Sequence, residues 1–87
     1  MRQIIVHKQF VKQFRKLPTS VQKAFQSRRD LFLENPNDPL LKVHALHGSF
    51  HGHQSFNVNA DIRVVFKEVE HDTYLFTAIG SHSELYE

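Results

Sequence analysis

The chain contains no cysteine among its 87 residues. This absence excludes disulfide bonds, thiolate metal sites and thiol-based catalysis together. No apolar run approaches the ~20 residues that a membrane-spanning helix requires. The N-terminal residues do not resemble a secretory signal peptide either. We therefore expect a soluble, cytoplasmic protein with no membrane partner.

The length predicts a single small domain spanning residues 1–87. Chains of this size bury only roughly 60–65% of their unfolded surface, so the stability should be modest. Apolar residues nevertheless make up 40% of the sequence and include eight phenylalanines. These residues are sufficient for one core, and no internal repeat or low-complexity segment interrupts them.

The net charge of +2 conceals a strong asymmetry along the chain. Residues 1–34 hold eight Lys/Arg against two acids, which gives +6, whereas residues 35–87 hold three against seven, which gives −4. Such polarity indicates that a polyanion docks on the N-terminal part. An ordinary solvated basic surface explains the same charges equally well.

The apolar spacing of the first half predicts one strand and two helices. Gln3–Val6 is a β-branched run typical of a strand, and His7–Leu17 has apolar residues at helical spacing. A second helix is predicted over Ser20–Leu33. Thr19 at its N-cap and Gln22 three residues later fit a capping box.

The second half predicts three strands. They are Gln54–Asn59, Asp61–Val69 and Thr73–Ile79, and Gly80 is expected to end the last one before a short tail over Ser81–Glu87. The order β-α-α-β-β-β predicts an α+β fold in which a two-helix hairpin packs on a small, mainly antiparallel twisted sheet. Strand alternation places the following residues on opposite faces of the sheet: Ile62, Val64 and Phe66 against Arg63, Val65 and Lys67, and Tyr74 and Phe76 against Leu75 and Ile79.

The first predicted helix carries like charges one turn apart, at Lys8, Lys12 and Arg15. Such pairs destabilise an isolated helix by a few tenths of a kcal/mol each. No acid within the helix relieves them. The pattern favours an anionic partner, either a nucleic acid or an acidic protein segment.

Histidines concentrate in the second half of the chain, with four of them in residues 44–53 and another at His82. They flank the predicted strand that carries Arg63 between apolar residues. Imidazole transfers protons near neutral pH and is also the commonest metal ligand. A guanidinium group can hold a phosphate through paired hydrogen bonds. These residues therefore indicate a nuclease-like site, a metal site or merely a polar surface.

Several short motifs carry a resemblance to a known family. They are His44-Ala-Leu-His-Gly48, Gly52, Asp61-Ile-Arg-Val-Val-Phe-Lys67 and Ile79-Gly-Ser-His-Ser-Glu-Leu-Tyr86. Together they resemble the toxins of the RelE/ParE superfamily, and most closely the YafQ-like branch of type II toxin–antitoxin systems. The resemblance covers roughly residues 42–86. It implies a RelE-like fold and a ribosome-dependent mRNA endonuclease that needs no cofactor and is silenced by a cognate antitoxin.

The resemblance also implies roles for individual residues. His44 matches a catalytic histidine, and Asp61 matches the aspartate that opens the central strand. Arg63 matches an arginine that contacts phosphate. His82 matches a histidine of acid–base transfer, and Tyr86 matches an aromatic residue that stacks on or orients the substrate base. The residues that we expect to contact RNA are Lys8, Lys12, Arg15, His53, Asn57 and Lys67.

Two positions depart from the family pattern. Ala45 stands where proline is common, and Asn57 stands where several YafQ-like proteins carry a further active-site histidine. Asparagine cannot transfer a proton at neutral pH, so that role is either taken by a neighbour such as His53 or lost.

Four alternatives stay open at the level of sequence. His44, His47, His51 and His53 are dense enough to bind a metal, but they match no standard helical metal-ligand motif and lack a nearby carboxylate. The ParE branch, which poisons gyrase, shares the fold but needs no proton-transfer residues. An inactive member that only binds its antitoxin is the third alternative. The fourth is a stand-alone DNA-binding module, although the helical hairpin lacks a clear recognition-helix pattern. Arg63 also has a purely structural interpretation, an ion pair with Asp61 or Glu68.

Overall fold

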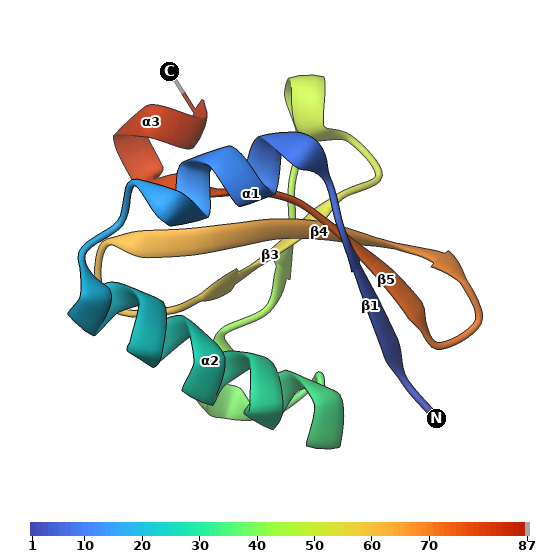
Figure 1. Cartoon of the computed structure of the whole chain (residues 1–87). Helices are drawn as coiled ribbons and strands as arrows, with labels where there is room; N and C mark the ends of the chain where they lie inside the picture. Colours follow the sequence, from blue (N-terminus) through green and yellow to red (C-terminus); the bar gives the residue numbers. More distant parts are fainter. Residues whose placement is uncertain (87) are drawn as a thin grey trace.

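A five-stranded sheet with the strand order β1-β5-β4-β3-β2 organises the fold (Figure 1). The computed structural model describes residues 1–86. Strand β1 runs parallel to β5, and the other neighbouring strands are antiparallel. The elements in chain order are β1 (Gln3–Val6), α1 (Lys8–Arg15), α2 (Thr19–Glu34), the 3-10 turn η1 (Pro39–Leu41), β2 (His44–Ala45), the 3-10 turn η2 (Gly48–Phe50), β3 (Gln54–Asn57), β4 (Ile62–Glu70), β5 (Thr73–Ser81) and α3 (His82–Tyr86). The predicted α+β arrangement of a helical hairpin on a mainly antiparallel sheet is confirmed, and no helix of residues 1–86 is long and apolar enough to cross a membrane.

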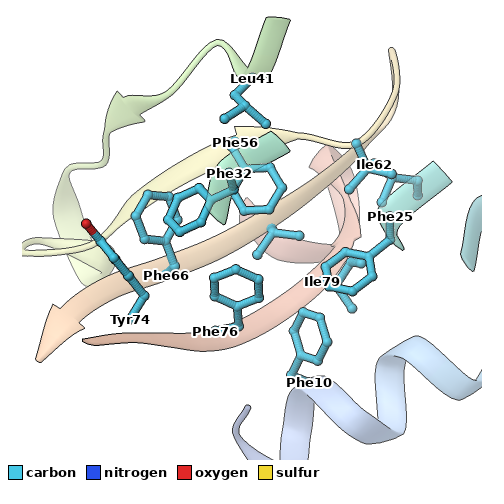
Figure 2. Close-up of a cluster of buried hydrophobic side chains, with 12 residues drawn as sticks. Phe10, Phe25, Phe32, Leu41, Phe56, Ile62, Phe66, Tyr74, Phe76 and Ile79 are labelled. Carbon is cyan, nitrogen blue, oxygen red and sulfur yellow. The ribbon is translucent and has the colours of Figure 1, made fainter. Parts of the chain in front are cut away.

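The main core lies between the sheet and the helices α1 and α2 and is built around the ring of Phe32. This ring is fully buried, and its centroid lies 5.3, 5.0, 4.9 and 5.6 Å from those of Phe56, Phe66, Tyr74 and Phe76 (Figure 2). Burying one such side chain contributes roughly 1.5–3 kcal/mol. The apolar stripe of α2 thereby fixes the position of the sheet.

A second, smaller apolar cluster lies on the opposite face of the sheet. It contains Val65, Ala78 and Leu85, with the partly buried Leu46, Phe50 and Tyr86 packed against them. Val65 faces this side because its neighbours in β4 face the main core. The cluster therefore anchors α3 and the segment around η2 to the face of the sheet that α1 and α2 leave open.

A bulge in the β4–β5 pairing changes which residues share a face. The register shifts between Val65 and Phe66, which leaves Thr77 as an extra residue on β5. An extra residue reverses the alternation that follows it. Ile79 consequently lies in the main core together with Phe76, so the expectation that these two face opposite sides is wrong.

The predicted capping box at the start of α2 is also wrong. Pro18 occupies the N-cap position and makes no side-chain capping bond, because Thr19 is already the first helical residue. The side-chain amide of Gln22 instead donates to the carbonyl oxygens of Phe14 and Leu17, at 3.1 and 3.2 Å. These bonds satisfy carbonyls at the end of α1 and thereby join the two helices of the hairpin.

The C-terminal part differs from the predicted tail. Strand β5 continues past Ile79 to Ser81, with Gly80 paired to Arg63 of β4, and α3 follows directly. A Cβ atom at Gly80 would lie 3.3 Å from Oε1 of Glu84, so glycine allows α3 to fold close against the end of the strand. The last residue of the predicted tail lies outside the described residues.

Candidate active site

A pocket of about 290 Å³ lies on the face of the sheet that carries the smaller apolar cluster. Its lining residues come from β2, the segment around η2, β4 and α3: His44, Leu46, His47, Phe50, Arg63, His82 and Tyr86. Four of the five residues that the sequence predicts to be catalytic thus come together. The fifth, Asp61, does not line the pocket.

Helix α3 presents two of these residues. His82 and Tyr86 are four residues apart, which places them on one face of the helix. Their ring centroids lie 4.7 Å apart, with the planes inclined at 66°. The buried Leu85 fastens the helix to the apolar cluster, so both rings face the pocket from a fixed element.

The start of α3 is fixed by a reciprocal pair of hydrogen bonds. The backbone N–H of Glu84 donates to Oγ of Ser81 at 3.1 Å, and the backbone N–H of Ser81 donates to Oε1 of Glu84 at 2.8 Å. This pair is a capping box, the device that the sequence predicted for α2 instead. Hydrogen bonding of the carboxylate to the Ser81 backbone N–H, and secondarily to the Ser81 side chain, lowers the pKa of the Glu84 carboxyl below its usual 4.5.

The aromatic side of the pocket is formed by Tyr86 and Phe50. Their ring centroids lie 5.7 Å apart and the planes are perpendicular, an edge-to-face contact. The hydroxyl of Tyr86 is buried and has no hydrogen-bond partner among residues 1–86. Sequence analysis missed Phe50 and Leu46 as pocket residues, because nothing in the sequence shows that the segment around η2 folds back over the sheet.

Arg63 contributes the positive charge of the pocket. Its Nη1 atom donates to the carbonyl oxygen of Asn59 at 3.0 Å. Within residues 1–86 no ion pair joins it to Asp61 or Glu68, so the purely structural alternative has no support there. A guanidinium group without a carboxylate partner is available to an anionic ligand.

Asp61 lies in the turn between β3 and β4 and is exposed. Its backbone N–H and that of Ile62 donate to the side-chain oxygen of Asn59, at 2.9 and 2.7 Å. This turn ends β3 at Asn57, two residues earlier than predicted. The carboxylate of Asp61 therefore stands outside the pocket, at the beginning of the strand that carries Arg63.

The histidines of residues 44–53 separate into different environments. His47 lines the pocket, although it is not among the catalytic or RNA-contacting residues that the sequence predicts. His53 does not line it; its Nδ1 atom is buried without a partner in the described chain, and its ring lies 6.1 Å from that of Phe50. Asn57 is the register partner of Arg63, with a buried Oδ1 that has no partner within residues 1–86.

No three ligand atoms of these histidines lie within 4.8 Å of one another in the described part of the chain. There, three ligand atoms come within 4.8 Å of one another only at Glu68, His71 and Asp72, on the exposed turn between β4 and β5. The metal alternative for residues 44–53 therefore has no geometric support.

None of the predicted basic contacts lines the pocket. Lys8, Lys12 and Arg15 are on the outer part of α1, and Lys67 is half-buried on β4. The C-terminal end of α1 and the start of α3 share a neighbouring cavity of about 280 Å³, lined by Lys16 and Glu84 among others. Lys16, directly after α1, and Glu84 of α3 therefore line the same cavity.

The helical hairpin on a mainly antiparallel sheet is the architecture of the RelE-like fold. RelE in the archaeal RelE–RelB complex from Pyrococcus horikoshii has the same fold, with a TM-score of 0.73 and 22% identity over 92% of this chain and 93% of that one. Residues 2–87 match the family described as "Bacterial toxin of type II toxin-antitoxin system, YafQ". The chain belongs to this family.

Two further structures agree with this assignment. YafQ from E. coli aligns over 100% of both chains with a TM-score of 0.78 and 22% identity. YafQ in the E. coli DinJ–YafQ complex aligns over 100% of both chains with a TM-score of 0.78 and 20% identity. No match was found among curated proteins.

Proposed function

We propose that this toxin is an endoribonuclease that cleaves mRNA on the ribosome by acid–base chemistry, without a metal or cofactor. One observation carries the proposal: His44, Arg63 and His82, which lie far apart in the sequence, line one pocket together with Tyr86. Metal-free RNA cleavage requires a base, an acid and a cation, and two imidazoles with a guanidinium group are sufficient for these roles.

The chemistry assigns a task to each group. The ribose 2′-oxygen attacks the adjacent phosphorus while a base removes its proton, and the bond to the 5′-oxygen breaks as an acid protonates it. His44 and His82 supply this pair, and each such group contributes on the order of 10²- to 10⁴-fold. Arg63 binds the phosphate and stabilises the charge that develops in the transition state.

The remaining pocket residues position the substrate. Tyr86 offers its ring to an unstacked base, the usual way in which proteins hold single-stranded RNA. His47 faces the same space and adds a further imidazole to a site in which Asn57 cannot move a proton. Asp61 is a proposed member of the site because its exposed carboxylate adjoins the strand of Arg63.

We also propose a cognate antitoxin as the protein partner. The solved relatives include a DinJ–YafQ complex and a RelE–RelB complex. The charge of +6 over residues 1–34 suits an acidic segment laid across the sheet or the helical hairpin.

The direct test is primer extension on mRNA from cells that briefly express the toxin. His82→Ala is compared with His71→Ala, which removes an exposed imidazole from the distant β4–β5 turn. We expect discrete new 5′ ends within translated frames for the wild type and for His71→Ala, and none for His82→Ala.

The other outcomes separate the alternatives. Growth arrest without new 5′ ends would refute the nuclease and point to the gyrase-poisoning branch. A wild-type chain that neither arrests growth nor cleaves mRNA would be an inactive, antitoxin-binding member.

A further inference from the structure

Ser55 is the one polar side chain among the fully buried residues of the described chain. A buried hydroxyl group is costly unless it is hydrogen-bonded. Oγ of Ser55 lies 3.2 Å from Nε2 of His44, its register partner across the β2–β3 ladder. The apolar surroundings therefore leave this hydroxyl directed at one imidazole of the pocket.

The other ring nitrogen of His44 is also held. Nδ1 lies 3.0 Å from the carbonyl oxygen of Lys42, a residue in the left-handed conformation with a φ of 51°. A carbonyl oxygen can only accept, so Nδ1 carries the proton in this contact. In the neutral ring Nε2 is consequently the acceptor, and the Ser55 hydroxyl is the donor.

We propose that Ser55 is a positioning residue that fixes the reactive nitrogen of His44, an inference that rests on the proposed nuclease function. The Lys42 carbonyl sets the tautomer and the Ser55 hydroxyl sets the ring orientation. The only basic lone pair of His44 is thereby held at Nε2, on a ring that lines the pocket.

A hydroxyl group suits both protonation states of the ring. When His44 acts as the base, the hydroxyl turns away, the O2′–H bond of the ribose breaks and an Nε2–H bond forms. The new Nε2–H points back towards the ribose oxygen, and Oγ of Ser55 beside it accepts the second branch of a three-centre hydrogen bond. Nδ1–H still donates to the carbonyl oxygen of Lys42. A hydroxyl group can make this reversal because it has one donor and two acceptor lone pairs.

The burial of Ser55 separates this role from substrate binding. Its side chain is 0% exposed, so RNA cannot touch it, and its effect must pass through His44. Removing it should lower kcat and leave KM for programmed ribosomes unchanged. Partners that orient functional histidines at metal sites typically contribute on the order of 10- to 100-fold, and we expect a loss of that size here.

The experiment compares Ser55→Ala with Thr77→Val in purified toxin acting on ribosomes programmed with mRNA. Thr77 is a matched control because its hydroxyl donates to the backbone carbonyl of Val65 in the same sheet, at 3.1 Å, and does not contact His44. We expect kcat to fall only in Ser55→Ala. Unchanged antitoxin binding verifies that each variant is folded.

A second measurement is independent of cleavage. Nitrogen-15 spectra of the side chain should show a protonated Nδ1 in His44, and the Nε2 resonance should move towards that of an unbonded imine nitrogen in Ser55→Ala but not in Thr77→Val. Wild-type kcat in Ser55→Ala, or an unmoved Nε2 resonance, overturns the proposal. If the wild-type toxin leaves mRNA intact, the proposed nuclease function is refuted. The proposed contribution of Ser55 to catalysis is then refuted with it.

Discussion

Ser81 and Glu84 exchange two hydrogen bonds, each donating its backbone N–H to the side chain of the other. Helix α3 has only five residues, and isolated helices of that length are unstable in water. The cap and the buried Leu85 are therefore what hold His82 and Tyr86 over the pocket.

Ser81→Ala should loosen α3 without unfolding the protein. Loss of an N-cap hydroxyl costs about 1 kcal/mol of helix stability, and the main core does not involve this residue. Amide hydrogen exchange should become faster in residues 82–86 and stay unchanged in β4, and cleavage should slow. Ser83→Ala, at an exposed serine of α3 itself, is the control. Equal exchange in the two variants would argue against the cap.

The same cap predicts a dependence on pH. Hydrogen bonds from Ser81 lower the pKa of Glu84 below its usual 4.5. Because the folded-state pKa is the lower one, the carboxylate stabilises α3 fully above about pH 4.5, and the contribution is lost as the pH falls through the lowered pKa. Carbon-13 titration of the Glu84 carboxyl and exchange of the α3 amides should change together. Glu84→Gln should remove this pH dependence, and its persistence there would assign it to another group.

The fold is predictable from the sequence because apolar residues recur clearly at helical spacing in the first half and at strand spacing in the second half. The alternation in β4 correctly predicts that Ile62, Val64 and Phe66 share one face, on which they join the main core. The prediction fails in β5, where one extra residue exchanges the faces on which the following side chains lie. Nothing around Thr77 marks a bulge, so simple alternation assigns Ile79 to the wrong face.

The site is predictable in part. Motif resemblance identifies His44, Arg63, His82 and Tyr86, which the fold brings together. The Ser-x-x-Glu signal for α3 is present in the sequence, but the segment that follows it is too short to show a helical period. Ser55 has no signal, because its contact with His44 depends on the register of a two-residue strand.

Arg63→Lys should test whether the fork of the guanidinium group is required. Lysine keeps the charge but cannot contact the Asn59 carbonyl and hold a phosphate through paired bonds at once. We expect cleavage to fall by on the order of 10²-fold or more, as for the loss of one transition-state donor, with unchanged antitoxin binding. Lys67→Arg on the same strand is the reciprocal control. Full activity of Arg63→Lys would reduce the role of this residue to charge alone.

Two phenylalanines should separate stability from activity. Phe32→Ala empties the centre of the main core and should cost about 3–5 kcal/mol in the free energy of unfolding. Phe50→Ala removes a partly buried ring that supports Tyr86, so it should cost less stability and reduce cleavage in the folded protein. Urea denaturation and cleavage rates measured on the same samples test this contrast. A Phe50→Ala variant with wild-type cleavage would show that Tyr86 needs no support from it.

Charge reversal on α1 tests whether the basic helix docks on the ribosome. Lys12→Glu and Lys23→Glu change the net charge equally, one on α1 and the other on α2. If α1 binds phosphates, Lys12→Glu should weaken ribosome binding, and the slope of log K against log salt should decrease by about one unit for each phosphate that is no longer neutralised. The triple reversal at Lys8, Lys12 and Arg15 should flatten the slope further. Since both reversals change the net charge equally, equal weakening by the two single variants would mean that a general attraction and not docking on α1 explains the effect.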